Sequence, residues 1–295
     1  MDRAENGTPG SMITAWRNHE RRWKMNRYVY AVISRRSRGV SIGVNLNPDK
    51  ICNFNCIYCQ VNRKIPPAFQ KVNLEKLTGE LDLILQAEKD GSLYDDPPFN
   101  ALTPAERGVR DIAFSGDGEP TTFRRFEEVI RIAAGARQRF GLHLAKLVLI
   151  TNAACFDKKS VRAALDVLDE NQGEIWAKLD AGTEEYFRLV NRAHLPLARI
   201  LKNILDAARV RPLVIQSLWS RINGAAPPDE EIEAYCDKLN GLIGAGGKIK
   251  NIQIHTVARD PAEVYVSPLT GDELDRIAFI VTSRIPASTV ITFSA

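Results

Sequence analysis

The most informative segment of the chain reads Ile51-Cys52-Asn53-Phe54-Asn55-Cys56-Ile57-Tyr58-Cys59, with its cysteines spaced C-x3-C-x2-C. The chain of 295 residues contains five cysteines, so three of them lie in this one short segment. Thiolates this close together repel one another and oxidise easily unless a metal centre holds them. The segment therefore predicts a metal site.

The number of cysteines narrows the kind of metal site. Structural zinc takes four protein ligands, commonly from paired C-x2-C units, and an iron–sulfur cubane normally takes four cysteines. Here three thiols stand together, and the nearest histidine in sequence is the distant His19. Three thiolates suggest an iron–sulfur cluster with one iron open to a small molecule. A non-catalytic iron–sulfur or zinc-binding module is the alternative.

The C-x3-C-x2-C spacing, with the aromatic Tyr58 before the last cysteine, resembles the cluster motif of the radical S-adenosylmethionine (SAM) enzymes. The resemblance implies that Cys52, Cys56 and Cys59 bind three irons of a [4Fe-4S] cluster, with Tyr58 among the cofactor-binding residues. SAM would occupy the fourth iron. It also implies a low-potential electron donor of the flavodoxin or ferredoxin type, and cleavage of SAM to a 5′-deoxyadenosyl radical that abstracts hydrogen from the substrate. The cofactors carry that chemistry, and the protein binds and orients them.

The composition is that of a globular protein with a sizeable core. Apolar residues make up 44% of the chain, the formal net charge is +4 and the pI is about 8.8. This mildly basic balance permits an anionic partner without requiring one. The first residues lack the apolar segment of a signal peptide, and no apolar run is long enough to span a bilayer. With unpaired cysteines, we expect a reducing, cytoplasmic setting and no membrane association.

The N-terminal part is unusually basic. We expect residues 1–38 to form a basic extension that packs on a core domain of residues 39–295. From Trp16 to Arg38, eight arginines and lysines alternate with tryptophans and tyrosines. Such a segment can bind nucleic acid, with charges on phosphates and rings on bases. The alternative is a solvated helix whose aromatic residues pack on the domain.

Strand and helix patterns alternate along the rest of the chain. Apolar runs predict strands, and residues with helical spacing follow each of them. Alternation of this kind predicts an α/β fold with a parallel sheet, and right-handed crossovers would curl six such units into a partial (β/α)6 TIM-like barrel. The expected strands are 39–46, 109–114, 146–151, 174–180, 213–218 and 249–257, with a last one at 289–293. The expected helices are 74–88, 123–140, 160–169, 184–190, 197–209, 229–243 and 271–284.

The second expected strand ends in Phe114-Ser115-Gly116-Asp117-Gly118-Glu119-Pro120. Glycines on both sides of an acid let the backbone approach a ligand closely, and its carbonyls and Glu119 can accept hydrogen bonds from an ammonium group. A plain strand-to-helix turn is the alternative. One βα unit after the cysteines, the loop resembles a variant of the Gly-Gly-Glu motif of radical SAM enzymes. The resemblance implies that Gly116, Asp117, Gly118 and Glu119 bind the amino group of SAM.

Polar residues also end the next strands. Asn152 could hydrogen-bond a ribose hydroxyl or cap a turn. Lys178 and Asp180 alternate with apolar residues and so point to one face. Buried charges must be paired or ligand-bound, so we expect either a SAM contact by Asp180, which the resemblance implies, or a Lys178–Asp180 ion pair. Gln216 ends the fifth strand, which the resemblance places near the adenine.

Three further residues are candidates for the catalytic chemistry. His255, in the sixth strand, is a substrate contact or a general acid or base, or else a core histidine. Arg259 could bind a carboxylate or phosphate of a substrate, or form an ion pair with Asp260 or Glu263. Cys155, past the third strand, is a redox or hydrogen-donor thiol or a small buried apolar residue.

Additional segments resemble one branch of the superfamily, the radical SAM iron–sulfur oxidoreductases related to the tRNA wybutosine-synthesis enzyme. The resemblance covers about residues 28–275. Its segments are Ser34-Arg35-Arg36, Ser41-Ile42-Gly43-Val44-Asn45, Ser115-Gly116-Asp117-Gly118-Glu119-Pro120-Thr121, and Arg259 with Pro261-Ala262-Glu263. Two substrate classes follow: a tRNA or other nucleic acid bound through the basic N-terminal segment, or a small molecule or peptide.

Overall fold

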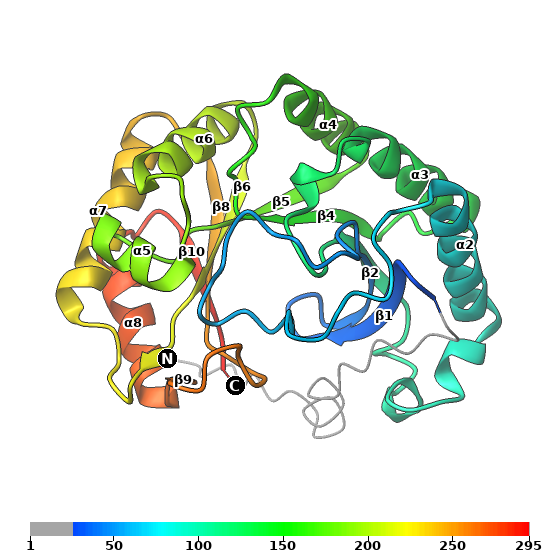
Figure 1. Ribbon diagram of the computed structural model, residues 1–295, viewed down its shortest axis with the longest axis horizontal. Helices are drawn as coiled ribbons and strands as arrows, with labels where there is room; N and C mark the ends of the chain where they lie inside the picture. The colour runs from blue at the N-terminus through cyan, green and yellow to red at the C-terminus, as the bar shows by residue number, and fades with distance from the viewer. Residues whose placement is uncertain (1–25, 295) are drawn as a thin grey trace.

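The computed structural model describes residues 26–294, which contain a curved eight-stranded sheet with helices on its outer face (Figure 1). Seven strands are parallel, and β1 is antiparallel at one edge. Across the sheet they are β1 (Val29–Ser34), β2 (Gly39–Val44), β3 (Val109–Phe114), β4 (Lys146–Thr151), β5 (Gly173–Lys178), β6 (Leu213–Leu218), β8 (Ile249–His255) and β10 (Thr289–Phe293).

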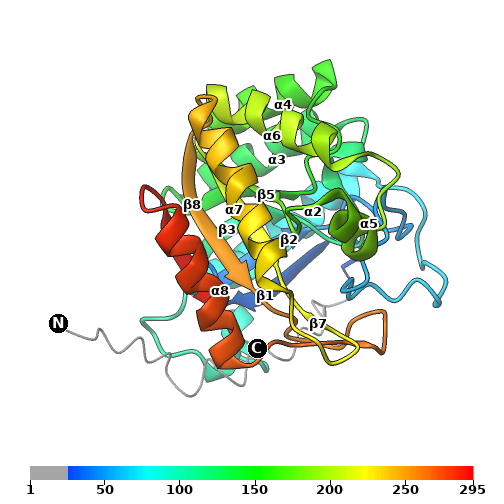
Figure 2. The ribbon, with the colours of Figure 1, turned by 90° about the vertical axis from the view of Figure 1, so that its left-hand side faces the viewer.

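Helices connect successive strands and form an arc around the sheet, as Figures 1 and 2 show. They are α2 (Leu74–Asp90), α3 (Phe126–Arg139), α4 (Lys159–Glu170), α5 (Glu184–Asn191), α6 (Leu197–Val210), α7 (Asp229–Gly244) and α8 (Gly271–Arg284). A small antiparallel pair, β7 (Arg221–Ile222) and β9 (Val266–Ser267), lies beside the main sheet. None of the helices within residues 26–294 is long and apolar enough to cross a membrane.

The expected partial barrel of parallel strands is confirmed. All six expected strands and the last one are present within a few residues of their expected limits. Most of them form because their apolar residues are buried on both faces, as parallel strands require, whereas the edge strand β10 has no fully buried residue. Helix α3 begins three residues later than expected because Pro120 starts a short 3-10 turn, Pro120–Thr122, after the loop of Glu119.

The basic N-terminal segment differs from expectation where the structure describes it. Its residues 29–34 form strand β1 rather than a solvated helix, and β1 pairs with β2 as a hairpin. The hairpin crosses the expected domain boundary at residues 38 and 39. Tyr28 is buried, and its hydroxyl donates to the carbonyl of Lys71 at 3.0 Å. The part of the segment from Trp16 to residue 25 lies outside the described residues.

A carboxylate on α2 fixes the start of β1. Glu80 is 5% exposed and accepts hydrogen bonds from the backbone N–H groups of Arg27, Tyr28 and Val29 at 2.9, 2.8 and 3.2 Å. These donors precede or begin an edge strand, so the sheet alone does not pair all of them. Glu80 therefore ties the first strand of the sheet to its first helix.

The inner face of the sheet encloses a lumen. Residues two apart on each strand share a face, and the inward ones include the apolar group Ala113, Val148, Trp176 and Val214. The larger core lies on the other face, between the sheet and the helices. Arg35, in the turn after β1, donates to the backbone carbonyl of Ser294 beyond β10, so it joins the two edge strands.

We predict that Glu80→Ala lowers the free energy of unfolding by about 3 kcal/mol, because three buried or half-buried N–H groups lose a charged acceptor. The exposed Gln86 on the same helix is the matched control, and Gln86→Ala should change stability by less than about 0.5 kcal/mol. Urea unfolding followed by circular dichroism measures both. Equal stability of the two variants would show that β1 does not depend on Glu80.

Candidate functional site

A cavity of about 660 Å³ occupies the lumen. Its wall combines inward residues of the strands with the loop that carries the cysteines. The inward residues include Ser41, Gly43, Asp111, Ala113, Ile150, Trp176, Lys178, Gln216 and His255. The cysteine loop contributes Tyr58 and Cys59, and the loop after β3 contributes Gly116 and Asp117. Both loops follow the carboxyl ends of parallel strands, the edge of the sheet where α/β barrels carry their functional groups. This edge therefore forms part of the cavity wall.

The three cysteines of the motif follow β2 on one irregular loop. All three side chains are half-buried, whereas Cys155 and Cys236 are fully buried. Arg63 donates to the sulfur of Cys59 at 3.0 Å, and the amide nitrogen of Asn191 lies 3.5 Å from the sulfur of Cys56. Donors of this kind stabilise negative charge on sulfur, although at Cys56 burial outweighs the contact with Asn191 and raises the pKa of the thiol.

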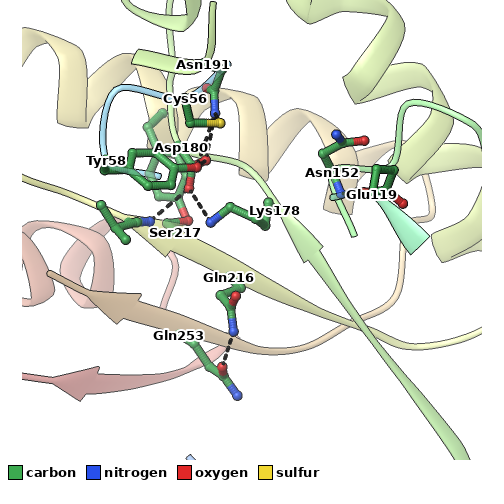
Figure 3. Close-up of polar contacts among 12 residues, drawn as sticks. Cys56, Tyr58, Glu119, Asn152, Lys178, Asp180, Asn191, Gln216, Ser217 and Gln253 are labelled. Carbon is green, nitrogen blue, oxygen red and sulfur yellow. Dashed lines mark hydrogen bonds and ion pairs between the residues drawn. The ribbon is translucent and has the colours of Figure 1, made fainter. Parts of the chain in front are cut away.

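The end of α5 holds the cysteine loop from one side (Figure 3). The backbone N–H of Asn55 donates to the carbonyl of Asn191 at 3.2 Å, and that of Ile57 donates to Val190 at 2.9 Å. The side chain of Asn191 bonds Asp180 at 2.9 Å as well as contacting Cys56. Helix α5 therefore positions the loop through both its backbone and one side chain.

Asp180 is the centre of this arrangement and is 2% exposed. Its carboxylate accepts from the Tyr58 hydroxyl, from Asn191, and from the backbone N–H of Leu218 at 2.9 Å. The ammonium of Lys178 forms an ion pair with it at 3.2 Å. The ion pair considered from the sequence is therefore present. Protein donors surround Asp180, and its observed contacts fix Tyr58 rather than face the cavity.

Glu119 performs a similar task on the other side of the loop. It is 3% exposed, and it accepts from the hydroxyl of Thr151 at 2.6 Å and the backbone N–H of Asn152 at 2.7 Å. It also accepts from the backbone and hydroxyl of Thr121. Burial raises the pKa of Glu119, while these hydrogen bonds oppose that rise. Asn152 in turn donates to the side chain of Asn53 at 2.8 Å, between the first two cysteines.

Gly118 allows the two loops to pack together. A Cβ atom at this position would overlap the backbone carbonyl of Ile51, which directly precedes Cys52. It would also come within 2.7 Å of the Asn47 side chain. Glycine is therefore needed here for close approach rather than for an unusual backbone angle.

The residues expected to bind SAM thus fall into two groups. Tyr58, Gly116, Asp117 and Gln216 line the cavity, whereas Gly118, Glu119, Asn152 and Asp180 do not and hold loops together. The Gln216 amide donates to Gln253 at 3.2 Å on the inner wall. The sequence predicted the strand ends correctly. Some side chains of the loops that follow these ends face the cavity, and others contact neighbouring loops.

The structure places the three catalytic candidates in two different environments. His255 and Arg259 line the cavity, and Cys155 packs in the main core. Burial and the positive charges of Arg36, Lys178 and Arg35 hold the pKa of His255 well below its usual value, so the imidazole is neutral near pH 7. Glu263, one expected partner of Arg259, instead pairs with Arg192 at 2.5 Å.

Asn191 is a site residue that the sequence reasoning did not single out, and Arg36 was named there only in the basic segment and in the resembling segment Ser34-Arg35-Arg36. Asn191 is the last residue of α5, a position usually occupied by cap residues, and no spacing relates it to the cysteines. Arg36 appeared as one arginine of a basic segment, yet it lines the cavity and lies over the ring of Trp176, 5.2 Å from its centre. The apolar run Val29–Ser34 directly before it was the signal for a strand that would turn this arginine inward.

The thiols need a positively charged partner in order to ionise. Burial raises the pKa of Cys56 to about 12 and also raises the pKa of Cys52. Within residues 26–294, no group of three His, Cys, Asp or Glu side chains is arranged to hold a single metal ion. Three thiols on one loop, with Asn191 and Arg63 donating to two of the sulfurs, are ligands of the kind that iron–sulfur clusters bind, one fewer than the usual four.

Comparison with curated proteins gives distant relatives. The chain is 26% identical over 261 residues to the UPF0026 protein MJ1312 of Methanocaldococcus jannaschii, covering 87% of this chain and 71% of that protein. It is 26% identical over 248 residues to a UPF0026 protein of Helicobacter pylori strain 26695, covering 82% and 70%. It is also 22% identical over 257 residues to GTPase Obg of Brachyspira hyodysenteriae, where it covers 86% of this chain but spans only 33% of that protein. No protein-family model matches the chain.

Comparison with solved structures is more informative. TYW1 with a lysine-pyruvate adduct bound aligns over 93% of this chain and 82% of its own, with TM-score 0.50 and 16% identity. The chain shares the fold of that protein. A cysteine-substituted mutant of spore photoproduct lyase aligns over 82% of this chain and 74% of its own, with TM-score 0.52 and 10% identity. These two likenesses confirm the expected fold.

We predict that Asp180→Asn lowers the iron bound per chain after anaerobic reconstitution, because the amide keeps one acceptor oxygen and places an NH2 group against the donors of either Tyr58 and Asn191 or Lys178 and Leu218. Lys178 also loses its buried partner, which should cost about 3 kcal/mol of stability. Asp237→Asn, whose side chain is 69% exposed on α7, is the matched control. If Asp180→Asn bound iron like the control and only SAM binding weakened, Asp180 would instead be a cofactor contact.

Proposed function

We propose that this protein is a radical SAM enzyme that acts on a substrate held in the lumen cavity. The main support is a single arrangement: the C-x3-C-x2-C loop lies at the carboxyl ends of the strands of a radical SAM fold, and its Cys59 lines the cavity beside Gly116 and Asp117. When bound, a [4Fe-4S] cluster and SAM supply a one-electron cleavage of SAM and a 5′-deoxyadenosyl radical that abstracts hydrogen from the substrate.

Each part of the chain has a defined task in this proposal. Cys52, Cys56 and Cys59 hold the cluster, and Asn191 and Arg63 stabilise the charge on sulfur. Gly116 and Asp117 offer polar groups to the amino group of SAM, in line with the motif that they resemble. Tyr58 and Gln216 line the remaining space for the cofactor. Asp180 and Glu119 act as positioning residues from either side of the loop.

The lumen protects reactive species from water. Ala113, Val148, Trp176 and Val214 pack together on the inner face of the sheet and are each at most 6% exposed. Arg35 and Ser294 join the edge strands. Exclusion of solvent prevents side reactions of a reactive intermediate, so these residues contribute to the outcome of the reaction without touching the reacting atoms.

A small molecule is the substrate class that the described residues support better than tRNA. The nucleic-acid hypothesis relied on the basic segment, yet Tyr28 is buried within it and Arg35 and Arg36 line the cavity. These two arginines are therefore placed to meet a group that enters the cavity, where Arg36 is exposed and Arg35 half-buried. The proposal further includes a low-potential electron donor of flavodoxin or ferredoxin type and a cytoplasmic setting.

We predict that the anaerobically reconstituted and reduced protein produces 5′-deoxyadenosine from SAM, and that Cys56→Ala abolishes this production because the cluster loses one of its three ligands. Chromatography of the quenched reaction measures the product. Cys236→Ala is the matched control: Cys236 is buried in α7, outside the cysteine loop.

The control variant should retain production close to that of the wild type after correction for any loss of folded protein. Production that is absent from the wild type, or equal in Cys56→Ala and Cys236→Ala, would contradict the proposed function and favour a non-catalytic metal-binding module.

A further inference from the structure

The charges on the cavity wall are unbalanced. Five basic side chains line the cavity, against the two carboxylates of Asp111 and Asp117, and one of the five, Lys178, is paired with the buried Asp180. The five are Arg35, Arg36, Lys50, Lys178 and Arg259. A cavity with low-dielectric walls focuses such a charge and attracts ligands of the opposite sign. The wall therefore selects an anionic ligand, beyond what the cluster and SAM require.

Arg36 is the cation best placed to receive that ligand. Its guanidinium lies over Trp176, which holds it in the lumen through a cation–π contact. Within the described part of the chain, no carboxylate oxygen comes within ion-pair distance of it. Asp111 is nearby, but that carboxylate already accepts from the hydroxyls of Ser37 and Ser41. The N–H groups of the guanidinium can therefore donate hydrogen bonds to a ligand.

His255 provides a second donor that lacks a partner. Its side chain is 7% exposed, lines the same cavity and packs edge-on against Phe293, with ring centres 6.2 Å apart. Its Nε2 atom is buried and has no hydrogen-bond partner among residues 26–294. A buried polar atom without a partner is unfavourable, so a ligand that hydrogen-bonds Nε2 would remove this cost.

The surroundings of His255 indicate the charge of that ligand. The neighbouring charges of Arg36, Lys178 and Arg35 lower the pKa of the imidazole, so all three cations lie close enough to act on it. A neutral imidazole can donate one N–H, and an anion that accepts it would also be attracted by the three cations. A cationic or apolar ligand beside His255 would leave the positive charges of the three side chains uncompensated.

We propose that Arg36 and His255 form a binding site for the phosphate group of a small phosphate monoester, which is the substrate. The inference rests on the proposed function, because it assumes that hydrogen is abstracted in the same cavity, which Cys59 also lines. A phosphate suits the site since its several oxygens can accept from the guanidinium fork and from Nε2 at once. A cavity of about 660 Å³ that also receives SAM leaves room for a small molecule only.

The test uses the full-length protein without cluster or SAM. Inorganic phosphate and glycerol phosphate are titrated into it by calorimetry, and histidine side chains labelled with nitrogen-15 are followed by nuclear magnetic resonance. The chain has only four histidines, so the signal of His255 can be assigned with a His255→Phe variant. We expect both ligands to bind and to shift the His255 signal, because Nε2 gains an acceptor.

The variants separate a specific site from general attraction. Arg36→Gln and His255→Phe should each weaken phosphate binding about tenfold, the effect of losing one charge-assisted or buried hydrogen bond. Arg124→Gln removes the same charge from an exposed residue outside the cavity and should bind like the wild type. Because Arg36 is exposed to the cavity rather than packed in the core, Arg36→Gln should fold, and thermal unfolding verifies this.

The inference would be overturned by any of three results: no binding of either phosphate to the wild type, equal binding by Arg36→Gln and Arg124→Gln, or acetate binding as tightly as phosphate. Binding of single-stranded RNA without binding of glycerol phosphate would overturn it as well. Production of 5′-deoxyadenosine without phosphate binding would refute this site and leave the proposed function intact. Phosphate binding without production of 5′-deoxyadenosine would refute the proposed function and leave this site intact.

Discussion

The carboxylate of Asp180 is the interaction on which the site depends. A buried carboxylate is costly unless donors surround it, and here the donors come from four parts of the chain: Tyr58 of the cysteine loop, Lys178 of β5, Asn191 of α5 and the backbone of Leu218 in β6. Satisfying one charge therefore fixes the mutual positions of two strands, a helix and a loop. The same requirement fixes the position of the loop, since any displacement of Tyr58 would remove a donor from the buried carboxylate.

A loop held in this way can present thiols to a cofactor without a fourth protein ligand. Glu119 holds the second side through Asn152 and Asn53, and Gly118 lets the loops pack directly against each other. From their positions at strand ends, Glu119 and Asn152 would be expected to bind a ligand. Here their side chains hold the loops together instead. In this protein the polar residues of the strand ends are divided: some build the frame of the site, and others, such as Gln216 and His255, face the cavity.

The sequence predicted the strands from β2 onward and the sheet that they form, because buried parallel strands are short apolar runs followed by helices of clear periodicity. It did not predict β1. Val29–Ser34 is equally apolar, but basic residues and aromatics on both sides made a helix or nucleic-acid segment the simpler interpretation. The roles of Glu119 and Asp180 were not predictable either, because a residue's position in a loop does not determine the side to which it points. The inward direction of Arg36 followed only from the hairpin of β1 and β2.

Electron paramagnetic resonance of the reduced, reconstituted protein tests the central claim most directly. If Cys52, Cys56 and Cys59 hold a four-iron cluster with one iron open, the spectrum should show a one-electron-reduced cluster whose signal changes when SAM is added. A Cys59→Ala variant should lose that signal. A spectrum that is identical with and without SAM, or a protein that binds zinc in place of iron, would contradict the account.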